Sequence, residues 1–265
     1  KKVRMACQRF FDDLERSKKD EGWPWVFDPA KAARPIDYME RYLTPSKGDY
    51  DRFTLMGWER FCEANLYGWV HRETGLRRYN EGLIVVGRGN GKSTLVSGNA
   101  SYGVSKDDER GADVYLLANS KEQASIVFNE CATQIRESKI SKHFRVLRDA
   151  IYYDRTNGCI RHRASDSRKL DGLNPAMAVF DELHAYRDFK LINVIKRGMN
   201  KRRQPLALYI TTMGTVLDGP LMYFYQLFTD AMIPGKLRDD VADRMFAFIC
   251  ELDETDDIED PNNWI

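Results

Sequence analysis

The residues best suited to chemistry form a glycine-rich segment, VVGRGNGKST, at positions 85–94. Its last four residues match the end of the phosphate-binding pattern G-x-x-x-x-G-K-[ST], although Val86 stands where the pattern begins with glycine. Glycines let a backbone approach a ligand closely, and the unpaired N–H groups at a helix start favour anions. The segment therefore predicts a nucleotide-phosphate site. Its residues are Gly87, Arg88, Gly89, Asn90, Gly91, Lys92, Ser93 and Thr94.

The side chains of this loop suit separate roles. Lys92 would reach the β- and γ-phosphates of a nucleotide, and the Ser93 hydroxyl would bind Mg²⁺. Arg88 adds a second positive charge inside the loop. A glycine-rich strand-to-helix turn without a ligand is the alternative, because G-K-S also occurs by chance.

A second motif favours nucleotide hydrolysis over the plain turn. The apolar run MAVF ends in Asp181 and Glu182, far downstream of the loop. An aspartate at a strand end beside such a loop can hold Mg²⁺ through water, and a glutamate one residue later can orient or deprotonate the attacking water. Taken alone, the pair is equally a charged turn after a strand. Loop and pair together, in this order, predict hydrolysis of a nucleotide.

A third apolar run, LALYI, ends in Thr211 and Thr212. Ligands of open parallel sheets bind at the carboxyl ends of the strands, so these hydroxyls could sense the γ-phosphate and transmit its loss. The β-propensity of threonine explains the pair equally well.

The elements that must position these residues alternate in type. Short apolar runs are followed by amphipathic segments that begin at Lys92 and Lys121 and lie near 186–201, which predicts a mainly parallel sheet with helices on both faces. A hairpin is expected at 152–164, around Thr156-Asn157-Gly158. The expected strands are 83–87, 114–119, 176–181, 206–212 and 245–252.

The first 80 residues predict a helical preface. Apolar residues recur at helical spacing over 3–16 and 53–69. Between them, WPWVFDPAKAARP carries three prolines and is expected to be loop-rich. The expected organisation is a preface over 1–80, a nucleotide-hydrolysing core over 81–252 and an acidic linker over 253–265.

Composition excludes several classes of protein. The 265 residues are 43% hydrophobic with a net charge of +1, which suits a folded domain and leaves nucleic-acid contact to a local patch. The five cysteines show no metal-ligand or disulfide spacing, so reduced thiols in a cytosol-like compartment are expected. No apolar run approaches the ~18 residues of a membrane span.

With these motifs assembled, the chain resembles the ATPase domain of tailed-phage large terminase subunits. The resemblance implies a P-loop NTPase of the ASCE (RecA-like) α/β fold with a helical N-terminal segment. Besides the loop at 87–93, four segments carry the similarity: LMGWERFCEANLYGW (55–69), ANSKEQA (118–124), LDGLNPAMAVFDELHAY (170–186) and ITTMG (210–214).

The resemblance assigns roles to the motif residues. It implies that Lys92 and Ser93 bind the phosphates and Mg²⁺ of ATP, that Asp181 supports the metal, and that Glu182 is the catalytic carboxylate. Thr211 and Thr212 would couple hydrolysis to movement. Arg88 occupies the family's basic loop position, where it would bond or sense the γ-phosphate; an exposed loop charge is the alternative.

The adenine side departs from the family pattern. Glu59 stands where the family's upstream segment has glutamine, and an ionised glutamate accepts hydrogen bonds but cannot donate them, which puts base selectivity in doubt. Trp58 could offer a stacking surface for the base or belong to the core.

Basic residues supply two further sets of candidates. In a ring of subunits, an arginine could complete a neighbour's site; the alternative is a solvated hairpin charge. Double-stranded DNA could be gripped by a basic cluster at a helix end, where the alternative is complementation of the helix dipole. The trans-arginine candidates are Arg155, Arg161, Arg163 and Arg168, and the DNA candidates are Lys196, Arg197, Lys201, Arg202 and Arg203.

The resemblance also implies a setting. The expected partners are viral double-stranded DNA, the portal of the procapsid, the small terminase subunit and further copies of the chain in a ring. The expected location is the host cytoplasm and, transiently, the portal. The protein is not expected in the mature virion or in a membrane. Nuclease activity is not expected from this chain. The alternatives are a DExH-type helicase or other nucleic-acid translocase fragment, since 181–184 reads DELH, and a nucleotide-controlled scaffold with little hydrolysis.

Overall fold

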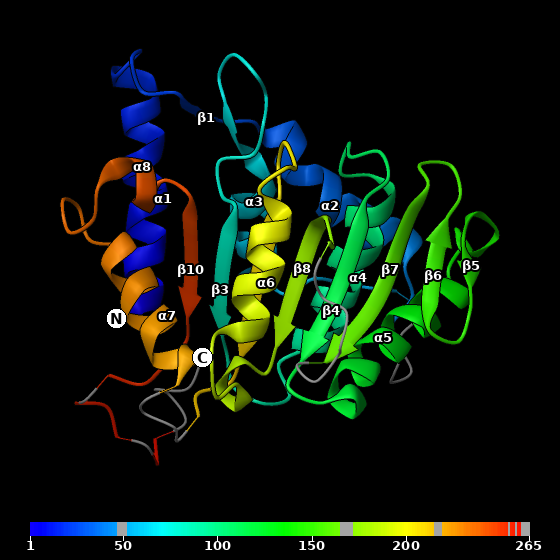
Figure 1. Ribbon diagram of the computed structural model, residues 1–265. Coiled ribbons are helices and arrows are strands. Elements are labelled where there is room, and N and C mark those ends of the chain that lie inside the picture. The colour runs from blue at the N-terminus through cyan, green and yellow to red at the C-terminus, as the bar shows by residue number, and fades with distance from the viewer. Residues whose placement is uncertain (47–51, 165–171, 215–218, 254, 258, 261–265) are drawn as a thin grey trace.

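An eight-stranded sheet forms the centre of the computed structural model, which describes residues 1–265 except 47–51, 165–171, 215–218, 254, 258 and 261–265 (Figure 1). Across the sheet the strands run β10-β3-β9-β8-β4-β7-β6-β5. Their bounds are β3 (Glu81–Val85), β4 (Asp113–Ala118), β5 (Arg145–Val146), β6 (Ala150–Tyr153), β7 (Gly158–Ala164), β8 (Pro175–Asp181), β9 (Leu206–Thr211) and β10 (Met245–Ile249).

Six of these strands, from β10 to β7, are parallel, and only β6 and β5 pair antiparallel at one end. The expected hairpin is the β6–β7 pair. Every residue of β8, β9 and β10 is buried, as expected for parallel strands covered on both faces. Because the strands are parallel, the ends of β3, β8 and β9 lie at one edge of the sheet. The mainly parallel fold is confirmed.

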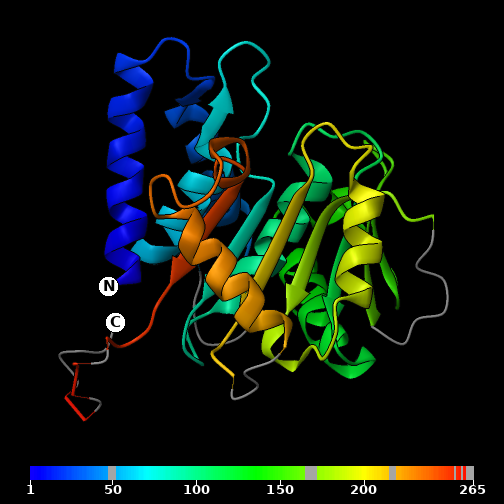
Figure 2. The same ribbon diagram turned by 60° about the vertical axis from the view of Figure 1, so that its left-hand side comes forward.

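Helices cover both faces of the sheet (Figure 2), and each face has its own hydrophobic core. On one face, α2 (Pro29–Tyr42), α3 (Gly57–Gly68), α4 (Lys92–Ser105) and α5 (Lys121–Arg136) contribute side chains to one core. On the other, α6 (Lys190–Met199) and α7 (Pro220–Ala231) contribute to the second. The short elements are η1 (Ser141–His143), η2 (Leu183–Ala185) and α8 (Asp239–Ala242). Within the described ranges, no helix has the length and apolar character needed to cross a membrane.

The proline-rich stretch expected to be loop is a strand and a helix. β1 (Trp25–Phe27) pairs antiparallel with β2 (Trp69–His71), and α2 begins at Pro29. Asp28 caps this helix by accepting hydrogen bonds from the N–H groups of Ala30 and Lys31. Pro29 occupies the first helical position, where a missing N–H costs nothing. The expectation was wrong because the prolines were taken as breaks, although one of them starts a helix.

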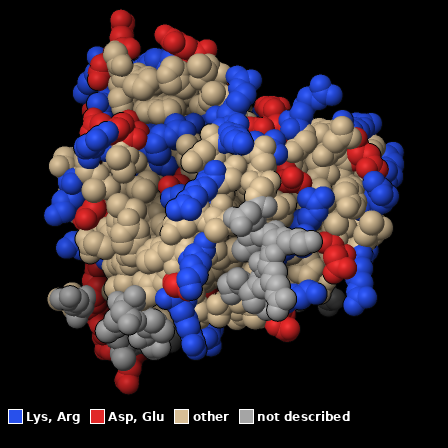
Figure 3. Space-filling model, in the orientation of Figure 1, with Lys and Arg blue, Asp and Glu red and all other residues tan. Residues whose placement is uncertain are grey.

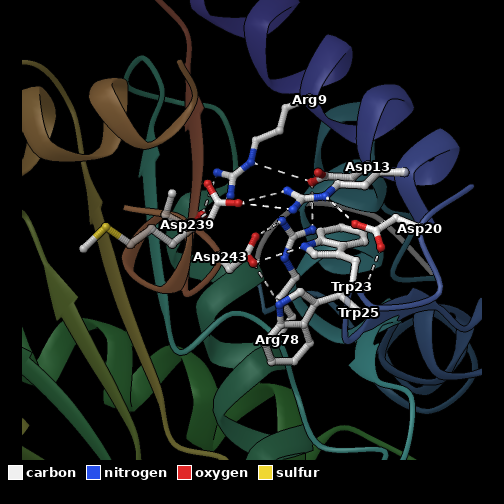
Figure 4. A network of polar contacts seen from close by, with 11 residues as sticks. Arg9, Asp13, Asp20, Trp23, Trp25, Arg78, Asp239 and Asp243 are labelled. Atoms are coloured by element: carbon white, nitrogen blue, oxygen red, sulfur yellow. Dashed lines mark hydrogen bonds and ion pairs between the residues drawn. The ribbon is translucent and has the colours of Figure 1, made fainter. Parts of the chain in front are cut away.

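The N-terminal helix α1 (Lys2–Lys19) lies against β10 and is fixed by a buried arginine (Figure 4). Arg78, with a side chain 1% exposed, donates to Asp13 of α1 at 2.7 Å and to Asp243, after α8, at 2.6 Å. The indole nitrogens of Trp23 and Trp25 also donate to Asp243. A buried guanidinium is tolerated only when such partners surround it. The helical N-terminal segment is therefore packed onto the sheet, while the boundary at residue 80 stays a prediction.

Candidate functional site

The glycine-rich loop joins the end of β3 to the start of α4. Gly89 and Gly91 adopt positive φ angles of 81° and 71°, a conformation that other residues rarely accept. Gly91 precedes the first residue of α4, so the loop presents the free N–H groups of that helix start. A Cβ on Gly91 would also lie only 3.1 Å from Oε1 of Glu59. The loop therefore has the backbone geometry of an anion site, as the motif predicts.

Lys92 is held over this loop. Its Nζ donates hydrogen bonds to the carbonyl oxygens of Gly87 at 2.8 Å and Val86 at 3.2 Å. Burial lowers the pKa of Lys92, the carboxylates of Glu182 and Asp181 raise it, and the charge of exposed Arg88 lowers it. The ammonium group is thus positioned at the loop, beside the Asp-Glu pair, where incoming phosphate oxygens can replace the carbonyl acceptors.

The two carboxylates at the end of β8 differ in environment. Burial raises the pKa of Asp181 to about 7, and the charge of Glu182 raises it as well. Glu182 has φ 49° and ψ 52°, a left-handed conformation that is uncommon outside glycine and concentrates at functional sites. The backbone therefore leaves the extended strand conformation at Glu182, directly after β8 ends at Asp181.

The donor set fits Mg²⁺ held jointly with a nucleotide. Mg²⁺ usually binds one or two protein oxygens together with phosphates and waters. A cation near Asp181 would favour the ionised form that burial disfavours, and Ser93 is the second residue of α4, in its first turn. The described residues contain no cluster of three or more His, Cys, Asp or Glu suited to a metal. Ser93 and Asp181 are therefore the residues that would hold this ion with the phosphates.

A histidine links Glu182 to the threonine strand, β9. Nδ1 of His184 lies 3.0 Å from Oε2 of Glu182 and 3.0 Å from Oγ1 of Thr211. The N–H of His184 also donates to Thr211 Oγ1 at 3.1 Å, and the Thr211 hydroxyl donates to the carbonyl of Thr212 at 2.7 Å. Since the Thr211 proton is used there, Nδ1 of His184 must carry the proton in its contact with Thr211.

One carboxylate oxygen of Glu182 is left without a hydrogen bond among the described residues. Its Oε2 is within ion-pair distance of His184 but not aligned for a hydrogen bond, and within the described part of the chain this buried oxygen has no hydrogen-bond partner. A Cβ on Gly214 would lie 2.6 Å from the Cβ of His184, so a glycine at position 214 leaves the room that His184 needs. His184 has no role among the residues predicted from the sequence, although its position in the D-E-x-H pattern at 181–184 is a signal for it.

The two residues predicted to lie on the adenine side, Glu59 and Trp58, make different contacts. Oε2 of Glu59 accepts a hydrogen bond from the N–H of Met56 at 2.7 Å, and its Oε1 faces Gly91. Burial raises the pKa of Glu59 to about 7, so near neutral pH a large fraction carries a proton and can donate as glutamine does. The Trp58 ring stacks on Phe248 of β10 at 5.8 Å. Their contact with a base stays a prediction.

The candidate arginines are divided between the two edges of the sheet. Arg163 lies near the carboxyl end of β7, at the edge that carries the loop and the Asp-Glu pair. Arg161 is paired with Asp113 at 2.7 Å, and Arg155 lies in the β6–β7 turn at the opposite edge. Arg168 lies outside the described residues. Of these candidates, the described structure brings only Arg163 to the edge of the site.

The basic cluster near the end of α6 is also divided. Lys196 pairs with Glu81 at 2.8 Å, and Arg202 donates to the carbonyl oxygens of Asn174 and Gly111. Lys196 and Arg202 therefore connect parts of the fold to one another. The other members are exposed at the edge opposite the loop: Arg197, Lys201 and Arg203.

The fold and site define a class of protein. A phosphate-binding loop follows β3, an Asp-Glu pair ends β8, and a threonine strand, β9, lies between them. This arrangement is that of a P-loop NTPase in which one further strand, here β9, lies between the strand of the phosphate-binding loop and the strand of the Asp-Glu pair. Residues 57–228 match the family model described as "Terminase large subunit, ATPase domain", and the chain belongs to this family.

Individual relatives agree with this family. The terminase large subunit of Lactococcus phage p2 is 21% identical over 250 residues, which are 91% of this chain and 45% of that protein. Protein YmfN of Escherichia coli K12 is 33% identical over 123 residues, 46% of this chain and 26% of that protein. The crystal structure of the HK97 bacteriophage large terminase shares the fold, with a TM-score of 0.74 and 18% identity over 88% of this chain and 46% of that one. The chain thus spans about half the length of the phage relatives.

Proposed function

We propose that this domain hydrolyses ATP, with Mg²⁺, to move double-stranded viral DNA into a procapsid. The observation that carries the proposal is the meeting of three strand ends at one edge of the sheet. The charges of Glu182 and Asp181 act to raise the pKa of Lys92 in the loop. Glu182 lies beside His184, which is hydrogen-bonded to Thr211. Binding, catalytic and coupling groups are thereby joined in one network.

Each residue has a distinct task in this reaction. The loop N–H groups and Lys92 bind the phosphates, while Ser93 and Asp181 hold the ion. Bound Mg²⁺ would neutralise charge on the β- and γ-phosphates. Glu182, whose Oε2 has no hydrogen bond among the described residues, is free to orient the attacking water and accept its proton. Exposed Arg88 projects from the loop and would bond the γ-phosphate.

The hydrolysis proposal is tested with Glu182→Gln. The amide keeps the shape of the side chain but cannot take a proton, so kcat should fall on the order of 10²-fold to 10⁴-fold while ATP still binds. Phosphate release at saturating Mg-ATP measures the rate, and binding of a fluorescent ATP analogue measures affinity. Lys92→Ala is the matched control, because it should weaken binding itself. Similar rates for wild type and Glu182→Gln would sink the catalytic assignment.

DNA contact is proposed for the outer face of α6. Leu191, Ile192, Ile195 and Met199 face the sheet, which leaves Arg197 exposed on the helix; Lys201 and Arg203 are exposed just beyond its end. Figure 3 shows Lys and Arg side chains in a row over this helix. Such cations can hold a DNA backbone without reading its sequence.

Movement of DNA is a separate claim that needs the complete protein. Its partners in this proposal are the portal of the procapsid, the small terminase subunit and further copies in a ring, in the host cytoplasm. If a complete protein carrying Lys92→Ala packages DNA into procapsids, measured by protection of DNA from added nuclease, then ATP hydrolysis at this site does not drive packaging. We expect no protected DNA with this variant and normal protection with Lys139→Ala, an exposed lysine at the end of α5 away from the loop.

A further inference from the structure

A second cavity opens at the edge of the sheet opposite the ATP site. It has a volume of about 160 Å³ and lies where the ends of α2 and α4, the short helix η1 and the strand β6 meet. None of the site residues above lines it except Arg155, a candidate for a role at the other edge. Pockets for whole drug-sized ligands begin near 300 Å³, so this cavity admits a single planar ring and leaves its substituents at the rim.

The walls of the cavity are aromatic. Phe144 and Tyr153 lie 4.9 Å apart between ring centroids, and Tyr38 and Tyr42 lie 5.9 Å apart. Tyr38 is buried and accepts a hydrogen bond from Ser105 at 3.3 Å, which fixes one wall. Tyr42 is 42% exposed, so it stands at the mouth with part of its surface available. Aromatic faces of this kind stack on nucleobases of any sequence.

The rim of the cavity is cationic. Lys106, His143 and Arg155 line it, and none of the lining residues that the structure describes is acidic. No hydrogen bond or ion pair of these three side chains occurs among the described residues. Burial lowers the pKa of His143, and the charges of Arg155, Lys142 and Lys106 lower it further. The lowered pKa leaves His143 mostly neutral near pH 7, so the positive charge at the rim comes from Lys106 and Arg155, with no carboxylate among the described lining residues, as at a site for an anion.

We propose that this cavity binds one nucleotide unit, with the base against the aromatic walls and the phosphate at the cationic rim. The ligand class follows from the combination, since a planar ring and an adjacent anion are what a nucleotide presents. Bases inside a duplex are stacked and paired, so the cavity selects an unpaired nucleotide. That nucleotide comes from the end of a DNA strand or from free solution.

Binding is measured by fluorescence anisotropy with a labelled five-nucleotide oligothymidylate. The Lys92→Ala chain serves as background, which removes the ATP site from the assay. Tyr42→Ala should raise Kd about tenfold or more, because one stacking ring is lost. Arg155→Ala should weaken binding and reduce the slope of log Kd against log salt by about 1. Tyr42→Phe, which keeps the ring, and Arg148→Ala, an exposed arginine outside the cavity, should bind as the background does.

Two competitors identify the source of the nucleotide. If thymidine monophosphate displaces the oligonucleotide at similar concentration, the site takes free nucleotides; if only the oligonucleotide competes, it takes a strand end. Either result supports the cavity. Equal affinity for Tyr42→Ala and background, with unchanged thermal unfolding, overturns it. Equal competition by a closed hairpin duplex without unpaired ends also overturns it, because a backbone contact would then explain the binding.

Discussion

His184 makes three contacts that no neighbouring residue duplicates. Its ring nitrogen lies 3.0 Å from both Glu182 and Thr211, and its N–H also donates to Thr211. Glu182, the proposed catalytic carboxylate, is thereby connected to β9, the strand that lies between β3 and β8. A change in Glu182 during hydrolysis could reach β9 through this side chain, in addition to the direct pairing of β8 with β9.

We expect His184→Ala to slow hydrolysis without weakening ATP binding. Glu182 would lose the group that limits its orientation, and a small misplacement of a catalytic group costs about a hundredfold in rate. The comparison is kcat from phosphate release against Kd from a fluorescent ATP analogue. His71→Ala, on β2 and away from the loop, is the control. A loss of ATP affinity as large as the loss of kcat would assign His184 to folding or binding instead.

At the scale of elements, the sequence predicted the strands and helices that follow clear periodicity. The five apolar runs became β3, β4, β8, β9 and β10, and the loop, Asp181-Glu182 and Thr211 met at one edge because parallel strands end there. Contacts made by side chains far apart in sequence were not predictable. Pairing of Arg161 with Asp113 and of Lys196 with Glu81 depends on which strands are neighbours, and that order is not encoded locally.

A buried carboxyl group, that of Glu63, connects the helices α3 and α4, and its protonation state affects the stability of the folded chain. Glu63 is fully buried and accepts a hydrogen bond from Asn99 at 2.7 Å, and Asn99 accepts another from Tyr67. Burial raises the pKa of Glu63 to about 8 from an ordinary value of 4.5. The folded chain therefore keeps a proton that the unfolded chain releases, so stability falls as pH rises from about 4.5 to about 8.

Glu63→Gln removes this titration. The variant should gain stability relative to wild type between pH 5 and pH 8, by roughly 1–3 kcal/mol at the upper end, since one pKa unit corresponds to about 1.4 kcal/mol. Urea unfolding at several pH values measures the free energy of unfolding. The exposed Glu73→Gln should run parallel to wild type. A constant difference between Glu63→Gln and wild type across this range would show that Glu63 stays ionised in the folded chain.

At the scale of the whole molecule, the ATP site is open along its sheet edge. Arg163 lies at that edge but on β7, four strand positions from β3. With strands about 4.8 Å apart, this separation is about 19 Å, too far for its guanidinium to reach a nucleotide in its own loop. Among the described residues, its Nη1 donates to the carbonyl of the adjacent His162 at 2.9 Å. We therefore propose that Arg163 serves the site of a neighbouring copy.

Mixing two inactive variants tests this placement. Arg163→Ala should lower kcat on the order of 10³-fold, as expected for an arginine that stabilises the transferring phosphoryl group, and Lys92→Ala should abolish hydrolysis. In an equal mixture, Lys92→Ala subunits supply Arg163 to the intact loops of Arg163→Ala subunits, so about a quarter of the sites should recover. The recovered rate should rise with protein concentration, because it requires contact between copies. Arg110→Ala, an exposed arginine at the opposite edge, should remain active alone. A mixture no faster than its components would show that Arg163 acts within its own chain or only in folding.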